Sequence, residues 1–122
     1  MNILFVEYPK CSTCQKAKKW LEGKGVAFTS RNIKEERPGR EELEEWHKKS
    51  GLDLKRFFNT SGNLYKEMKL KDKLPQMSQE EKYELLATDG MLVKRPIVVA
   101  GDTVLVGFKE GEWEQGLLSN TL

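Results

Sequence analysis

The sequence lacks the features that mark membrane, fibrous or nucleic-acid-binding proteins. Its apolar runs fall far short of the roughly 20 residues that a membrane-spanning helix needs, so no membrane association is expected. There are 21 Lys and Arg against 19 Asp and Glu, and this interspersed net charge of +2 predicts no direct contact with nucleic acid. Four prolines and 33% charged residues are typical of a globular chain. We therefore expect a single domain over residues 1–122.

Cysteine is scarce as well, and only Cys11 and Cys14 are present. The apolar residues 3–6 have no basic segment ahead of them, so they are expected to form a buried strand rather than a signal peptide. This predicts a cytoplasmic protein, and structural disulfides are rare in the cytoplasm. A zinc site needs about four ligands, which two cysteines and the distant His47 do not supply. We expect no bound metal and no bound cofactor.

The hydrophobic pattern predicts a mixed order of strands and helices. Strands are expected at residues 3–6, 26–33, 97–99 and 103–106, and helices after residue 11, at 40–50, 64–70, 78–87 and 110–118. The first strand, helix and second strand form a βαβ unit, whose strands are parallel. Residues 37–90 show no strand signal. They are therefore interpreted as a helical insertion between a βαβ half and a ββα half.

Local signals mark where some of these helices begin. Ser12 or Thr13 is expected to cap the first helix, because a hydroxyl there can accept a hydrogen bond from the helix N-terminus. Ser78 and Glu81 have the spacing of a capping box. His47 lies among charged residues, so a solvated helix face explains it and no catalytic role is assigned to it.

The spacing and position of Cys11 and Cys14 predict thiol chemistry. A helix N-terminus presents unpaired N–H groups and about half a positive charge, which lowers the pKa of a thiol there below the free value of about 8.5. Cys11 is expected to be the exposed nucleophile, and Cys14, one turn further, the thiol that resolves its mixed disulfide. The alternative is a pair of inert, buried cysteines. Neighbouring lysines are expected to add positive potential: Lys10, Lys16, Lys18 and Lys19.

Three motifs resemble the arsenate reductase (ArsC)/Spx family along nearly the whole chain. They are residues 8–17 (YPKCSTCQKA), 94–99 (KRPIVV) and 106–108 (VGF), and residues 58–62 (FNTSG) are most similar to the Spx/ArsC-like branch of Gram-positive bacteria. The resemblance implies an α/β, thioredoxin-like fold with a mixed four-stranded sheet and a helical insertion. It also implies that Cys11 is catalytic, that Arg95 contacts an anion or the thiolate, and that the Arg95-Pro96 peptide bond is cis beside the cysteine loop.

The same resemblance implies two kinds of function. The first is a thiol oxidoreductase that reduces a small oxyanion or a disulfide, with glutathione, glutaredoxin or thioredoxin as external reductant. Glutaredoxin-linked arsenate reductases hold the oxyanion with two further arginines, however, and this chain has none at residues 59–62 and only Lys109 at residues 107–109. The second is a Spx-like redox-sensing regulator that binds the RNA polymerase α subunit. In both cases a monomer is expected.

Overall fold

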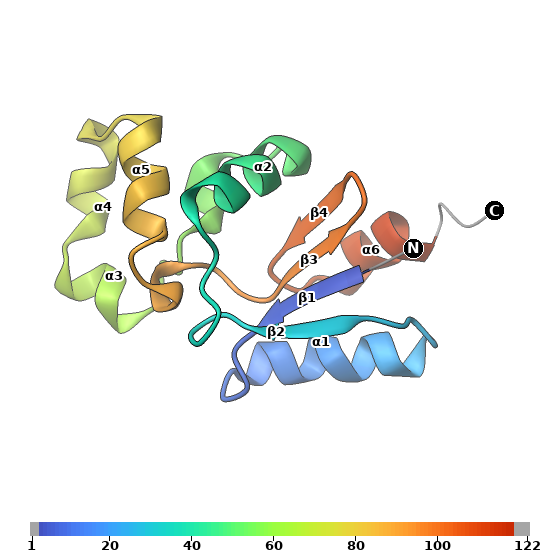
Figure 1. The fold of residues 1–122 in the computed structure, drawn as a ribbon. Coiled ribbons are helices and arrows are strands. Elements are labelled where there is room, and N and C mark those ends of the chain that lie inside the picture. The colour runs from blue at the N-terminus through green and yellow to red at the C-terminus, as the bar shows by residue number, and fades with distance from the viewer. Residues whose placement is uncertain (1–2, 119–122) are drawn as a thin grey trace. The chain divides into compact units, whose positions relative to one another are not determined.

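A computed structural model describes residues 3–118, and the chain divides into two compact units (Figure 1). The sheet unit consists of the described residues up to Asn32 and from Arg95 onward. The helical unit comprises residues 33–94, which include the stretch without a strand signal in the sequence. Each unit has buried apolar side chains of its own.

The sheet unit is built on four strands in the order β2-β1-β3-β4. Strand β1 (Ile3–Glu7) lies parallel to β2 (Thr29–Asn32) and antiparallel to β3 (Ile97–Ala100), which forms a hairpin with β4 (Thr103–Val106). This is the mixed sheet that the sequence predicts, and the fold is α/β and thioredoxin-like. The two inner strands, β1 and β3, contain most of the buried strand residues.

Strand β2 is shorter than the predicted strand at residues 26–33. Gly25 has a φ of 71°, and the Val26 N–H donates to the Leu21 carbonyl at 3.0 Å. Residues 26–28 therefore complete the end of α1 (Ser12–Gly23) and lie outside the ladder that pairs β2 with β1. At residues 26–28 the hydrogen bonds that end the helix determine the backbone conformation, although these residues have a high strand propensity.

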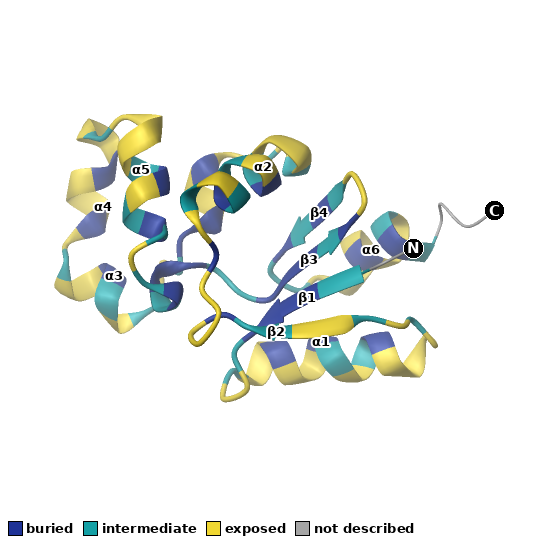
Figure 2. Ribbon diagram, in the orientation of Figure 1, coloured by how far each residue is buried: buried dark blue, intermediate teal, exposed yellow. Residues whose placement is uncertain are grey.

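One core cluster joins the sheet to its helices. Helix α1 and the C-terminal segment, α6 (Glu110–Trp113) with the π-helical turn η4 (Glu114–Leu118), pack their apolar side chains on one face of the sheet. The buried members are Phe5, Ala17, Leu21, Val98, Ala100, Trp113 and Leu117. Figure 2 shows α1 with buried positions along one side and exposed positions along the other. This is the pattern of an amphipathic helix, and it holds α1 against the centre of the sheet.

Backbone hydrogen bonds fix the turn before β3 to the end of β4. The Arg95-Pro96 peptide bond is cis, as expected. The Pro96 carbonyl accepts from the Gly107 N–H at 2.8 Å, and the Gly107 carbonyl accepts from Trp113 Nε1 at 2.8 Å. Gly107 has a φ of 75°, a left-handed conformation that favours glycine. The turn carrying Arg95 is thus tied to both β4 and α6.

The helical unit is a series of short helices. They are α2 (Arg40–Ser50), η1 (Leu54–Phe57), α3 (Asn63–Glu67), α4 (Leu70–Lys73), η2 (Leu74–Gln76), α5 (Gln79–Leu86) and η3 (Gly90–Leu92). The predicted capping box is confirmed: Ser78 Oγ accepts from the Glu81 N–H at 3.1 Å, and the Glu81 carboxylate accepts from the Ser78 N–H at 2.9 Å. The single helix predicted at residues 64–70 is wrong, because Lys69 is left-handed (φ 54°) and separates α3 from α4.

His47 occupies a different setting from the solvated face that the sequence predicts. Its ring is half-buried, and Nδ1 lies 2.6 Å from the Tyr83 hydroxyl. The ring also meets the edge of Phe57, with centroids 5.7 Å apart. Contacts between helices distant in sequence create this environment, so the charged neighbours of His47 give no indication of it. Through the Tyr83 hydroxyl, His47 links α2 to α5.

Candidate functional site

The topology of the sheet unit brings the cysteine loop and the Arg95-Pro96 turn to the same edge. Strand β1 ends at Glu7 and leads directly into the loop that carries Cys11, whereas β3 begins at Ile97, directly after Pro96. Because β1 and β3 are antiparallel neighbours, with Val6 opposite Ile97, the end of one strand lies beside the start of the other. The sheet therefore places residues that are more than 80 positions apart in sequence next to one another.

Cys11 is itself the N-cap of α1, so the predicted cap at Ser12 or Thr13 is wrong. Its backbone is extended (φ −87°, ψ 120°), and its sulfur accepts a hydrogen bond from the Cys14 N–H at 3.4 Å. The Gln15 N–H donates to the Cys11 carbonyl at 3.1 Å, which is the first hydrogen bond of the helix. A sulfur at the N-cap directly meets the unpaired N–H groups and positive end of the helix dipole. The hydroxyls of Ser12 and Thr13 lie one and two positions too late to do so.

The surroundings of Cys11 favour its thiolate. Partial burial is the largest single influence and opposes ionisation, yet the pKa of Cys11 lies below its ordinary value because several other contacts act together against burial. These are hydrogen bonds from the N–H and the thiol of Cys14, the positive charge of Arg95, and the N–H of Thr13. Cys11 is half-buried as a residue and thus partly accessible. An accessible thiol with a lowered pKa has the properties of a nucleophile.

Cys14 has the opposite character. It is fully buried in the first turn of α1. The pKa of Cys14 is raised to about 12. Burial is the largest cause, and the hydrogen bond to Cys11 and the negative charge of the Cys11 thiolate act in the same direction, while a hydrogen bond from the Tyr8 backbone and the charge of Arg95 oppose them. Both cysteines are free thiols in the structure. The pair therefore combines a half-buried sulfur with a lowered pKa and a buried thiol that stays protonated at neutral pH.

Arg95 lies over the ring of Tyr8, with the guanidinium carbon 5.3 Å from the ring centroid. Such a cation–π contact orients the guanidinium on the loop that carries Cys11. The sequence interpretation identified Arg95 but missed Tyr8. In the sequence, Tyr8 is an aromatic residue directly before Pro9, at the end of the predicted central strand. Its contact with Arg95 could not be inferred, because the sequence does not show which strand lies next to that one.

The expected contribution of the four neighbouring lysines is not found. None of them is among the causes of the lowered pKa of Cys11, whereas Arg95 is. Lys18 Nζ instead lies 3.5 Å from the carboxylate of Glu7, a buried acid at the end of β1. The other three side chains are exposed. Water screens the charges of exposed, flexible side chains. Lysines that are close to Cys11 in sequence therefore need not lower its pKa.

The two regions where arsenate reductases carry further arginines hold other residues. Lys109 Nζ lies 3.7 Å from the carboxylate of Glu112, so its charge is partly engaged. Residues 59–62 form a turn of the helical unit, in which the Gly62 N–H donates to the Asn59 carbonyl at 3.0 Å. Among residues 3–118, no cluster of three or more His, Cys, Asp or Glu side chains could hold a metal ion. No helix in that part of the chain has the length and apolar character needed to cross a bilayer.

The strand order, the helix capped by Cys11 and the Arg95-Pro96 turn together define a thioredoxin-like protein with a cysteine pair. The chain belongs to the ArsC family, whose family model matches residues 6–116. It is 55% identical over 115 residues to the uncharacterised protein YusI of Bacillus subtilis, covering 94% of this chain and 98% of that protein. It is 30% identical over 111 residues to the regulatory protein MgsR of the same organism, covering 91% and 86%. A crystal structure of a putative ArsC family related protein from Bacteroides fragilis superimposes with a TM-score of 0.92 at 57% identity, covering 94% and 97%.

The pH dependence of alkylation is expected to identify Arg95 as a cause of Cys11 ionisation. The rate of iodoacetamide labelling should rise with pH through a midpoint below that of a free cysteine, because the thiolate is the reacting form. Arg95→Gln removes a positive charge and should move this midpoint to higher pH. Lys10→Gln is the matched control, since Lys10 adjoins Cys11 in sequence and should leave the midpoint in place. Equal midpoints for the wild type and Arg95→Gln would contradict the assignment.

Proposed function

We propose that the protein is a thiol–disulfide oxidoreductase in which Cys11 is the nucleophile and Cys14 the resolving thiol. The observation that carries this proposal is the position of the Cys11 sulfur at the N-cap of α1, with the Cys14 N–H 3.4 Å away and a pKa below the ordinary value. Thiol–disulfide exchange requires one sulfur that ionises readily and attacks the substrate, and a second that stays protonated until the mixed disulfide has formed. The two cysteines differ in this way.

The proposed reaction begins when the Cys11 thiolate attacks one sulfur of a disulfide substrate. A bond forms between Cys11 and that sulfur, the substrate disulfide breaks, and the other substrate sulfur leaves as a thiolate. Cys14 then loses its proton and attacks the Cys11 sulfur, releasing the second substrate thiol and leaving a Cys11–Cys14 disulfide. Two electrons pass from the cysteine pair to the substrate. Glutathione, glutaredoxin or thioredoxin would supply two electrons to restore the dithiol.

The environment of Cys14 supports this order of steps. The negative charge of the Cys11 thiolate is one of the causes that raise the pKa of Cys14. Once Cys11 is bonded to a substrate sulfur, that charge is gone, and Cys14 ionises more readily than in the free dithiol. The resolving thiol is therefore activated by the first step. Arg95 supports that step by stabilising the Cys11 thiolate, and Pro96 fixes the turn on which Arg95 sits.

A disulfide suits this site better than arsenate does as a substrate. A tetrahedral oxyanion is held best by several bidentate donors, and arginine supplies them. Arg95 is the one arginine that acts on Cys11 among the described residues, and Lys109 faces Glu112. A disulfide needs no such set of donors, because it is uncharged when it binds and a negative charge appears only on the sulfur that leaves as a thiolate.

Trapping the mixed disulfide tests the proposal. The reduced protein is incubated with oxidised glutathione, quenched with acid and examined by intact-mass spectrometry. The wild type should lose two hydrogen atoms as the Cys11–Cys14 disulfide forms, whereas Cys14→Ser should retain one glutathionyl group because nothing displaces it. Stable glutathionylation of the wild type to the same extent would show that Cys14 does not resolve, and absence of any adduct on Cys14→Ser would show that Cys11 is not the nucleophile.

The similarity to the regulatory protein MgsR supports a regulator as the second candidate. The resemblance to the Spx branch of the family suggests that such a regulator would sense redox state and bind the RNA polymerase α subunit. In that case the cysteine pair is a switch rather than a turnover site. Binding of the purified α subunit, measured by calorimetry on the reduced and oxidised protein, separates the two functions. A regulator would bind in one redox state, and Cys11→Ser would retain binding but lose its response to oxidant. An oxidoreductase would show no binding in either state.

A further inference from the structure

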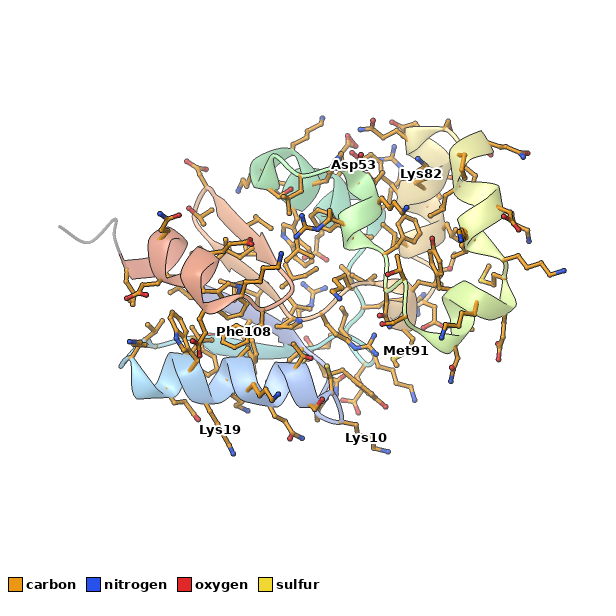
Figure 3. All side chains as sticks on the ribbon, turned by 180° about the vertical axis from the view of Figure 1, so that it is seen from behind. Lys10, Lys19, Asp53, Lys82, Met91 and Phe108 are labelled. Carbon is orange, nitrogen blue, oxygen red and sulfur yellow. The ribbon has the colours of Figure 1, made fainter. Side chains whose placement is uncertain are left out.

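The helical unit contains a cavity of about 220 Å³ that the cysteine chemistry does not use. It lies among η1, α3, α4, η2 and α5, and all its lining residues belong to this unit. Figure 3 labels two of them, Asp53 and Lys82, which lie close together on the same side of the unit. The cavity therefore needs an explanation separate from that of Cys11.

The base of the cavity is apolar and firmly held. Phe58 and Leu74 contribute side chains that are almost fully buried, and the exposed Pro75 lines the cavity as well. Phe58 pairs with Val93 in an isolated antiparallel bridge, and the Lys94 N–H donates to the neighbouring Phe57 carbonyl at 2.8 Å. A base fixed by backbone hydrogen bonds stays open without a ligand, as is typical of small-molecule sites.

The walls carry an excess of positive charge. Three lysines, Lys55, Lys71 and Lys82, face one carboxylate, Asp53, and this leaves two positive charges uncompensated. Within residues 3–118, none of these lysines forms an ion pair. Asp53 is itself engaged, since its Oδ1 accepts from the Lys55 N–H at 2.9 Å and caps η1. The lysine ammonium groups are thus available to a ligand.

A second hollow adjoins the first and has the same charge excess. It measures about 330 Å³, shares Asp53, Lys55 and Phe58 with the cavity, and adds Arg56 and Lys94. Two of its residues are basic beyond the shared lysine, and its only acid is the same Asp53. The positive potential therefore extends from the cavity along the surface of the unit and would attract anions toward it.

We propose that this cavity binds a phosphomonoester with a small apolar or aromatic body. A phosphate monoester carries about −1.5 to −2 charges at pH 7, which matches the two uncompensated lysines, whereas a carboxylate carries only one. Lysine is a common phosphate ligand. Pockets that hold drug-sized ligands measure roughly 300–1,000 Å³, so a cavity of about 220 Å³ suits a smaller body such as a single ring. Phe58, Leu74 and Pro75 would contact that body.

Three probes test both halves of the site: phenyl phosphate, inorganic phosphate and benzyl alcohol. Binding to the wild-type protein is followed by amide chemical shifts in two-dimensional NMR. Phenyl phosphate should bind more tightly than either other probe, shift the amides of η1, α4 and α5, and weaken as salt is added. Equal affinity for phenyl phosphate and inorganic phosphate would overturn the proposal, as would shifts confined to other parts of the chain or no binding at all.

A matched pair of variants isolates the lysines. Lys71→Gln combined with Lys82→Gln should weaken phenyl phosphate binding by about tenfold or more, because two charge-assisted hydrogen bonds are lost. Lys66→Gln combined with Lys73→Gln is the control, since it removes the same charge from α3 and α4 at two exposed residues that do not line the cavity. It should retain wild-type affinity. An equal loss of phenyl phosphate affinity in both variants would show that only the net charge of the protein matters, and this would overturn the proposal. Iodoacetamide labelling of Cys11 should be the same in all of them.

Discussion

Replacing Cys11 with serine is expected to reduce disulfide exchange by at least about 1,000-fold, because the nucleophile is removed altogether. A serine hydroxyl does not ionise near neutral pH, and Cys14 is buried and protonated, so no other thiol in the chain can take over. The measurement is the rate at which the reduced protein consumes a small disulfide, with rapid iodoacetamide labelling as a second readout.

Cys11→Ser is expected to remove the thiol without disturbing the fold. Serine is among the preferred N-cap residues, so Cys11→Ser keeps an acceptor for the Cys14 N–H and should leave α1 intact. Cys14→Ser provides the comparison: it should retain rapid labelling of Cys11 but lose the resolving step. Substantial disulfide exchange by Cys11→Ser would show that the nucleophile is another residue. If circular dichroism shows that Cys11→Ser is unfolded, the same measurement is made on Cys11→Ala.

The largest expected effect on stability is that of Gly90→Ala. Gly90 begins η3 and is buried, and a methyl group at its Cα would collide with the carbonyl of Ile33, a backbone atom that cannot move aside cheaply. Overpacking of this kind costs about 3 kcal/mol when the backbone must shift. For a chain of this size that corresponds to a fall of roughly 10 °C in the melting temperature.

Gly23→Ala is the matched control for this measurement. Gly23 is the last residue of α1, and a methyl group there would meet no atom within 4 Å. Alanine is also the better helix former, so this variant should melt at or slightly above the wild-type temperature. If Gly90→Ala melted together with Gly23→Ala, the close approach of Ile33 to Gly90 would not exist in solution.

Sequence patterns predicted the elements whose residues act locally. Apolar runs located β1, β3 and β4, whereas β2 covers only Thr29–Asn32 of the strand predicted at residues 26–33. The spacing of Ser78 and Glu81 located the start of α5. The placement of Cys11 at the start of α1 followed from the same reasoning, because a strand, a turn and a helix are all visible in the sequence. The cis bond at Arg95-Pro96 came only from the family resemblance, since most bonds before proline are trans.

Features that depend on contacts between distant segments escaped the sequence analysis. The packing of Tyr8 against Arg95 exists only because β1 and β3 are neighbours. The hydrogen bond between His47 and Tyr83 likewise needs α2 and α5 to meet. The break between α3 and α4 at Lys69 could not be predicted, because no glycine or proline marks it in the sequence. The cap at Cys11 was missed for a different reason: sulfur is a weak acceptor, and the hydroxyls beside it were the more obvious choice.

The cap at Cys11 links chemistry at the sulfur to the order of the helix. While the sulfur is a thiolate, its negative charge sits at the positive end of the α1 dipole and stabilises the first turn. Conversion to a disulfide neutralises that charge and weakens the acceptor, so the opening turn of α1 frays more easily in the oxidised protein. Amide exchange at the start of this helix is thus a direct gauge of the redox state, and any partner that contacts this turn meets a different surface in each form.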